Sequence, residues 1–148
     1  TKCFKLIHTK KSGDISLVDI GKNINKIFTQ LFDKFNIEYV LIENQISPIA
    51  NRMKTIQGMI AQYFIDCNNY NIQFMSAANK LKLFNNNNKK TTYSERKKLG
   101  IKYTQELLLK KNMISHLEYF NKNNKKDDLA DCLLQGIYYL STFNKLNI

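Results

Sequence analysis

Long apolar runs, a signal peptide and paired cysteines are all missing from this sequence of 148 residues. No apolar run is long enough to span a bilayer, so no membrane partner is expected. The three cysteines, Cys3, Cys67 and Cys132, have no paired metal-binding spacing. Their odd number indicates free thiols, which is typical of an intracellular protein in a reducing compartment.

The length and the apolar content are those of a single globular domain. Hydrophobic residues make up 43% of the chain. A chain of this length buries roughly two-thirds of the surface that it exposes when unfolded. We therefore expect one domain over residues 1–148.

Positive charge is concentrated in one part of the chain. The formal net charge is +11, and residues 80–126 alone carry +10, from thirteen Lys and Arg against three Glu. A solvated surface does not require such segregation, so we expect a polyanionic partner, which favours nucleic acid. The alternative is a coding bias towards Lys and Asn that has no role in binding.

Hydrophobic periodicity predicts helices and strands in alternation, which is typical of an α/β fold. Asp19 suits the N-cap of the first helix. The second helix should bury Met53, Ile56, Ile60 and Phe64 and leave Gln57 elsewhere on its surface. The predicted elements, in chain order, are a hairpin with strands at 3–7 and 15–18, a helix from residue 19 to near 36, a strand at 39–42, a helix opened by Ser47-Pro48, a strand at 72–76, a mobile basic loop at 85–90, and helices at 93–112, at 113–120 and from 127 onwards.

The strand at residues 39–42 ends on a carboxylate. Its apolar, partly β-branched residues indicate burial on both faces, as at the centre of a sheet. Glu43 follows at the exit of the strand, where open α/β sheets place their ligand chemistry. The next helix should bring Arg52 near Glu43, either to contact a substrate phosphate or as an ordinary solvated charge. The alternative for Glu43 is that it only carries the chain into solvent.

A second acidic cluster, residues 127–131, opens the last helix. Asp127 is best explained as a charge that the helix macrodipole favours. Asp128 and Asp131 are three positions apart, which puts both on one face, beside the predicted apolar stripe. Because two carboxylates this close repel each other, a hard divalent cation such as Mg²⁺ or Mn²⁺ is the usual partner. The stripe consists of Leu129, Cys132, Leu133, Gly136, Ile137 and Leu140.

Together, the two acidic motifs resemble those of the RNase H-like nucleases. The sequence is similar to the RuvC-type Holliday junction resolvases in two acidic motifs and in the segment between them. The motifs are Ile42-Glu43-Asn44-Gln45 and Asp127-Asp128-Leu129-Ala130-Asp131, and the segment contains Tyr93 and the basic residues 96–98. The closest resemblance is to the branch found in poxviruses and other large DNA viruses. It covers most of the chain and implies an RNase H-like mixed sheet flanked by helices. It also implies a viral replication site in a host cell.

The resemblance implies that Glu43, Asp128 and Asp131 are catalytic carboxylates that bind Mg²⁺ or Mn²⁺. The family carries a further Asp on its first strand, and the sequence around that Asp resembles Leu17-Val18-Asp19-Ile20-Gly21 of this chain. The interval from Asp19 to Glu43 is too short for the strands that the fold needs there. We therefore expect the first catalytic Asp to precede Thr1, so that this chain is N-terminally truncated and weakly active or inactive.

The predicted function is metal-dependent cleavage of four-way DNA junctions by a two-fold homodimer, with the exposed parts of the helix at 49–67 as a candidate interface. One alternative is another RNase H-like nuclease, acting on branched DNA or RNA–DNA hybrids. Another is a non-catalytic nucleic-acid-binding domain. A solvated helix face is also an alternative role for the basic cluster at 96–98. The candidate contacts to DNA phosphates are Arg52, Lys80, Lys82, Arg96, Lys97 and Lys98.

Overall fold

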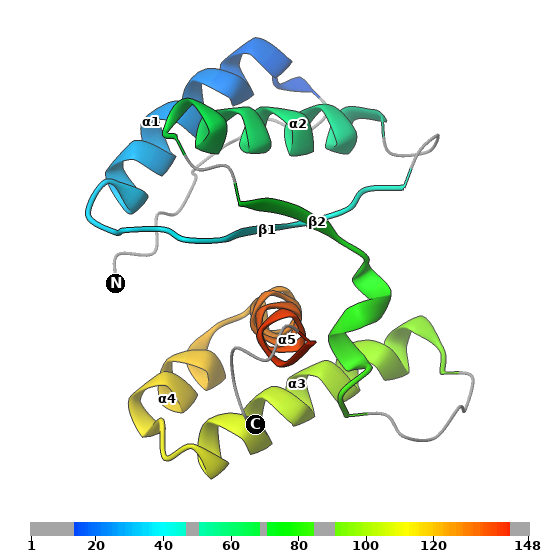
Figure 1. Cartoon of the computed structure of the whole chain (residues 1–148). Helices are drawn as coiled ribbons and strands as arrows, with labels where there is room; N and C mark the ends of the chain where they lie inside the picture. The colour runs from blue at the N-terminus through cyan, green and yellow to red at the C-terminus, as the bar shows by residue number, and fades with distance from the viewer. Residues whose placement is uncertain (1–13, 47–50, 69–70, 85–90, 143–148) are drawn as a thin grey trace. The chain divides into compact units, whose positions relative to one another are not determined.

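The computed structural model describes residues 14–46, 51–68, 71–84 and 91–142 (Figure 1). The chain divides into two compact units, Thr1–Phe74 and Met75–Ile148. The elements, in chain order, are helix α1 (Leu17–Phe32), strand β1 (Val40–Glu43), helix α2 (Asn51–Asp66), strand β2 (Ile72–Met75), the 3-10 helix η2 (Ala77–Leu81), and helices α3 (Tyr93–Lys110), α4 (Ile114–Lys122) and α5 (Lys126–Thr142). The prediction of one domain over 1–148 is not tested by this division.

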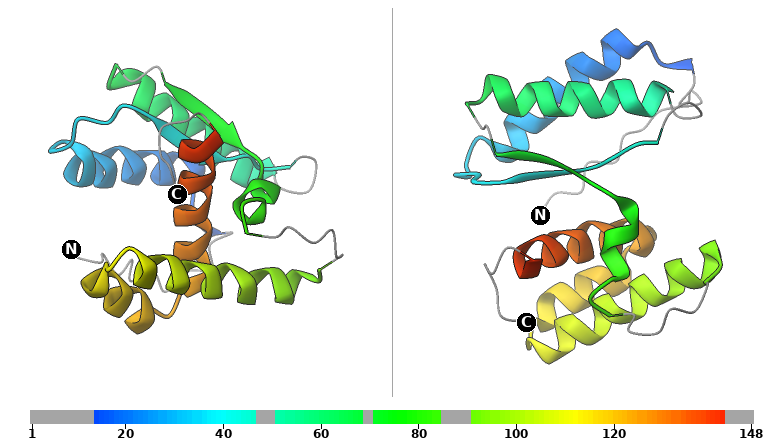
Figure 2. Two further views of the ribbon diagram at one scale, coloured as in Figure 1. Left: turned by 60° about the horizontal axis from the view of Figure 1, so that its bottom comes forward. Right: turned by 45° about the vertical axis from the view of Figure 1, so that its right-hand side comes forward.

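The first unit is built around a β-α-β arrangement. Among the described residues, β1 and β2 form a two-stranded parallel sheet, and α2 connects them. A parallel pair requires a crossover of this kind, because the chain must return to the same end of the sheet. The backbone N–H of Val40 donates to the carbonyl oxygen of Asn71 at 3.0 Å. Helix α2 packs against both α1 and β1 (Figure 2).

The core of this unit lies between β1 and the two helices. Val40 and Ile42 are 7% and 8% exposed, whereas the alternate residues Leu41 and Glu43 are half-buried. The strand is therefore fully buried on one face only, which corrects the prediction of burial on both faces. Phe28 of α1 packs edge-on against the ring of Tyr63 of α2, with centroids 5.4 Å apart.

The start of α1 shows that the predicted strand at 15–18 is wrong. The Ser16 hydroxyl accepts a hydrogen bond from the Val18 N–H at 3.2 Å, which makes Ser16 the N-cap of the helix. Asp19, the predicted cap, lies instead in the first turn, where the macrodipole also favours a carboxylate. The predictions for the strand at 3–7, for Ser47-Pro48 and for the loop at 85–90 lie outside the described residues.

Helix α2 buries only part of its predicted apolar stripe: Phe64 is buried and Ile60 packs against the core, but other core positions were not predicted. Gln57 is 7% exposed and Ala61 is buried, whereas Met53 is 49% exposed. The Gln57 side chain lies inside the fold, where it accepts a backbone hydrogen bond from the segment after β1. The end of α1 differs in the same way, since the helix stops at Phe32 and leaves Phe35 67% exposed.

The second unit is helical, with α5 packed against η2, α3 and α4. Ala130 and Leu134 of α5 are completely buried. A Cβ added at Gly100 of α3 would lie 3.9 Å from the Cβ of Ala130, so small residues let the two helices approach closely. The helices predicted for residues 93–112 and 113–120, and the one from residue 127 onwards, are confirmed to within a few residues.

The buried face of α5 is rotated from the predicted stripe. Its buried positions are Ala130, Leu134, Gln135 and Tyr139, none of which belongs to the predicted stripe. Leu129 and Leu133 pack at the edge of the core, and Cys132 is exposed. Ala130 lies on the buried face where α3 approaches closely at Gly100, a contact that the hydrophobic pattern of α5 alone does not indicate.

The architecture is mixed α/β, mostly helical, with a small parallel sheet, so the general α/β prediction is confirmed. In the part of the chain that the structure describes, no helix combines the length and the apolar character needed to cross a membrane.

Candidate functional site

Glu43 is placed by the strand and fixed by α2. It is the last residue of β1 and is half-buried. Two residues later, the backbone N–H of Gln45 donates to the Gln57 side-chain oxygen at 2.7 Å. Because Gln57 is buried in α2, this bond holds the exit of the strand against the helix. Sequence reasoning missed Gln57, although a strand that ends inside a fold leaves a backbone N–H in need of an acceptor.

Arg52 lies in the first turn of α2, and its guanidinium donates to the carbonyl oxygen of Ile15, just before α1. The contact links the starts of the two helices. A guanidinium has five N–H donors, so a backbone bond is compatible with an additional phosphate contact. The prediction of a role in DNA binding is untested by this geometry.

The acidic turn of α5 is largely neutralised by lysines. The Asp127 carboxylate accepts a hydrogen bond from the Lys97 ammonium of α3 at 2.6 Å. Asp131, one turn later, is paired in the same way with Lys80 of η2. Asp128 points elsewhere, with a side chain 69% exposed and its carboxylate 4.0 Å from the Lys125 ammonium.

The spacing explains this division. Positions four apart lie on one side of a helix, so Asp127 and Asp131 both reach neighbouring elements of the unit. Asp128 and Asp131 were predicted to share a face, yet their side chains have different partners. Two predicted DNA contacts, Lys80 and Lys97, are thereby bound to carboxylates of the same unit.

The ion pair between Lys97 of α3 and Asp127 of α5 shifts the pKa values of both side chains. The hydrogen bond from Lys97 lowers the pKa of Asp127 below its ordinary value. The same contact, with a smaller effect of Tyr93, raises the pKa of Lys97. Both groups therefore stay charged over the physiological pH range.

The start of α3 is closed by a capping box. The Thr92 hydroxyl accepts from the Glu95 N–H at 3.2 Å, and the Glu95 carboxylate accepts from the Thr92 N–H at 2.7 Å. This backbone bond lowers the pKa of Glu95. Since the carboxylate already occupies the end of the helix, a phosphate at this helix would be held by side chains.

The other predicted DNA contacts lie at the surface of the second unit. Lys98 is exposed, and Arg96 is exposed while donating to the carbonyl oxygen of Thr91 at 2.6 Å. The Lys82 ammonium lies 5.5 Å from the centre of the Tyr138 ring. These three cations differ from Lys80 and Lys97, whose ammonium groups are bound to carboxylates.

Within the residues that the structure describes, no three His, Cys, Asp or Glu side chains form a group that could hold a metal ion. Glu43 belongs to the first unit, whereas Asp128 and Asp131 belong to the second. The prediction that these three residues bind one cation remains a prediction.

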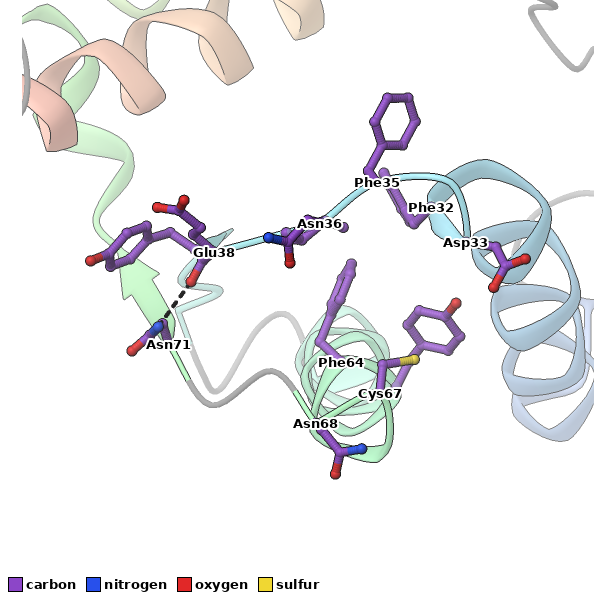
Figure 3. A pocket seen from close by; sticks show the side chains of 12 residues that line it. Phe32, Asp33, Phe35, Asn36, Glu38, Phe64, Cys67, Asn68 and Asn71 are labelled. Carbon is purple, nitrogen blue, oxygen red and sulfur yellow. Dashed lines mark hydrogen bonds between the residues drawn. The ribbon is translucent and has the colours of Figure 1, made fainter.

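One cavity of the first unit has a volume of about 740 Å³, and no predicted site residue lines it. It lies at the ends of α1 and α2 and at the start of β1, away from the Glu43 end of the strand. Figure 3 shows Phe64 of α2 and Cys67, which follows this helix, at the cavity, with Asn71 bonded to the carbonyl oxygen of Glu38.

The chain is similar to an uncharacterized protein of Acanthamoeba polyphaga mimivirus, with 35% identity over 137 residues. The match covers 80% of this chain and 32% of the relative, so the chain spans about a third of that protein's length. No family model matches the chain. No solved structure matches it either. The similarity to a viral protein is compatible with the viral origin that the sequence predicts.

Proposed function

We propose that this chain is part of a RuvC-type Holliday junction resolvase with an RNase H-like fold. The observation that supports this most directly is the position of Glu43. It ends a parallel strand that is buried on one face, and the helix that follows returns to the neighbouring strand. Open α/β sheets bind their ligands at this end of the strands. The strongly basic segment that precedes the acidic turn of α5 is the second support.

In this proposal Glu43, Asp128 and Asp131 bind Mg²⁺ or Mn²⁺. Their oxygen atoms suit these hard cations. The ion pair of Asp131 with Lys80 does not favour a metal, because the ammonium already neutralises that carboxylate. The ions would supply an activated water and stabilise the departing 3′ oxygen of a phosphodiester. The chain itself would position the DNA.

The exposed cations Lys82, Arg96 and Lys98 contact phosphates in this proposal, and Arg52 does so from the first unit. Such contacts orient the substrate without reading its sequence. Cutting two strands symmetrically calls for a two-fold homodimer. Helix α2 offers exposed apolar side chains for such a contact, Met53 and Ile65, which are 49% and 41% exposed.

The second candidate is a nucleic-acid-binding domain without catalytic activity. The ion pairs of Asp127 and Asp131 with lysines favour it, because they give the acidic turn a structural role that needs no metal. A third candidate, another RNase H-like nuclease for branched DNA or RNA–DNA hybrids, shares the proposed chemistry and differs in substrate preference.

The test is cleavage of a labelled four-way junction, with a linear duplex of the same sequence as the comparison substrate. It uses the whole product of the gene that encodes this chain, in Mg²⁺ or Mn²⁺. We expect this protein to cut the junction in preference to the duplex. Binding is measured separately in Ca²⁺.

The variants are Glu43→Gln and Asp131→Asn, with Glu38→Gln as the matched control. Glu38 lies before β1, at the other end of the strand. Removing a residue that supports a metal ligand lowers activity roughly 10- to 100-fold, so removing a ligand itself should lower the cleavage rate at least as much. The control should cleave at the wild-type rate. If the whole gene product cuts no branched DNA, the resolvase proposal is wrong. Binding that survives in both variants would then favour the non-catalytic domain.

A further inference from the structure

Tyr93 is a large aromatic side chain that the fold holds at the surface. It is the first residue of α3, and it is 67% exposed. Next to it, the capping box between Thr92 and Glu95 fixes the start of the helix. The backbone that carries the ring is therefore rigid, although the ring contributes little to the core.

The ring is held from one side by a cation. The Lys97 ammonium lies over it, 5.0 Å from the ring centre. Lys97 is anchored in turn by Asp127 of α5, at 2.6 Å. A contact chain from α5 through Lys97 thus limits the orientations of Tyr93. Because the ammonium is paired with Asp127, it positions the ring and leaves phosphate contacts to other cations.

Two further cations follow Tyr93 on α3. Arg96 and Lys98, both exposed, follow it within the first two turns of α3. The acidic residue of this stretch, Glu95, is bound to the backbone N–H of Thr92 and so is turned to the helix end. A rigid aromatic ring among cations is the arrangement with which proteins bind unpaired nucleotides, because bases stack on the ring while cations contact the phosphates.

We propose that Tyr93 is a stacking platform for an unpaired base of DNA, with Arg96 and Lys98 contacting the adjoining phosphates. The inference rests on the proposed DNA-binding function and specifies it, because it names single-stranded or locally unpaired DNA as the ligand of this surface. Paired bases are stacked on their neighbours, so a branch point or a single strand offers what the ring requires.

The experiment measures binding of the full chain to oligo-dT and to a four-way junction by fluorescence anisotropy, without a metal that supports cleavage. In the junction, 2-aminopurine replaces one base at the branch point, because stacking on an aromatic ring quenches its fluorescence. The variants are Tyr93→Leu, which keeps apolar bulk, and Tyr93→Phe, which keeps the ring. Tyr119→Leu on α4 is the matched control, since Tyr119 is also exposed, at 44%, and no cation of the described residues lies over its ring.

We expect Tyr93→Leu to weaken binding to oligo-dT about tenfold, within the range for loss of one stacked base, and to abolish the quenching. Tyr93→Phe and Tyr119→Leu should bind within about twofold of wild type. A purely structural role of Tyr93 would lower the melting temperature and leave the quenching intact, which would overturn the inference.

Two failures can be told apart. If wild type binds DNA and Tyr93→Leu binds and quenches equally well, the stacking inference is wrong and the DNA-binding function stands. If wild type binds neither oligo-dT nor the junction at low salt, the proposed function is wrong and the inference falls with it.

Discussion

Replacing Gln57 by Leu should destabilise the exit of β1. Gln57 is 7% exposed, and its side-chain oxygen accepts the Gln45 N–H at 2.7 Å. Leu fills a similar volume, so the main loss is the acceptor. A part-buried N–H left without an acceptor costs about 1–3 kcal/mol. Since burial of the Leu side chain offsets a part of this, we expect a loss of about 1–2 kcal/mol, which is roughly a 5- to 30-fold drop in the ratio of folded to unfolded protein.

The matched control is Gln62→Leu on the same helix. Gln62 is exposed, and its amide donates only to the Asp66 carboxylate at the surface, at 2.8 Å. Such helix pairs contribute about 0.2–0.5 kcal/mol. Urea unfolding compares the two variants, and amide hydrogen exchange at Gln45 reports the local bond directly. Equal unfolding midpoints, with unchanged exchange at Gln45, would refute the assignment of Gln57 as the residue that holds the strand exit.

Two further outcomes follow from the second unit. Thr104 is fully buried, and its hydroxyl has no hydrogen-bond partner in the described structure, so Thr104→Val should stabilise the unit by about 1 kcal/mol in thermal unfolding; a lower melting temperature would contradict this. Because Lys97 lowers the pKa of Asp127, this carboxylate contributes stability above its unfolded pKa of about 4 and loses it as the pH falls through the folded pKa. Lys97→Met should raise the pKa of Asp127 in an NMR titration and flatten the acid dependence of stability, and an unchanged pKa would disprove the pairing.

The candidate site divides into a predictable and an unpredictable part. Glu43 at the end of β1 follows from a short apolar run and the carboxylate after it, which are local features of the sequence. Gln57 and the partners of Asp131 and Asp127 depend on contacts between distant segments. Lys80 and Asp131 are 51 positions apart, and Lys97 and Asp127 are 30 apart. Charge spacing along one helix predicted a shared face for Asp128 and Asp131, but it could not indicate that a lysine of η2 reaches Asp131.

The sequence by itself determined the order of the helices and strands from β1 onwards, the concentration of positive charge before α5, and the carboxylate at the strand exit. These depend on residues within a few positions of each other, where hydrophobic periodicity and backbone preference act directly. The tertiary structure decided which faces of α2 and α5 are buried and which carboxylates are neutralised. Those outcomes depend on how closely helices approach, as at Gly100 and Ala130, and on buried polar groups that must find partners in other elements.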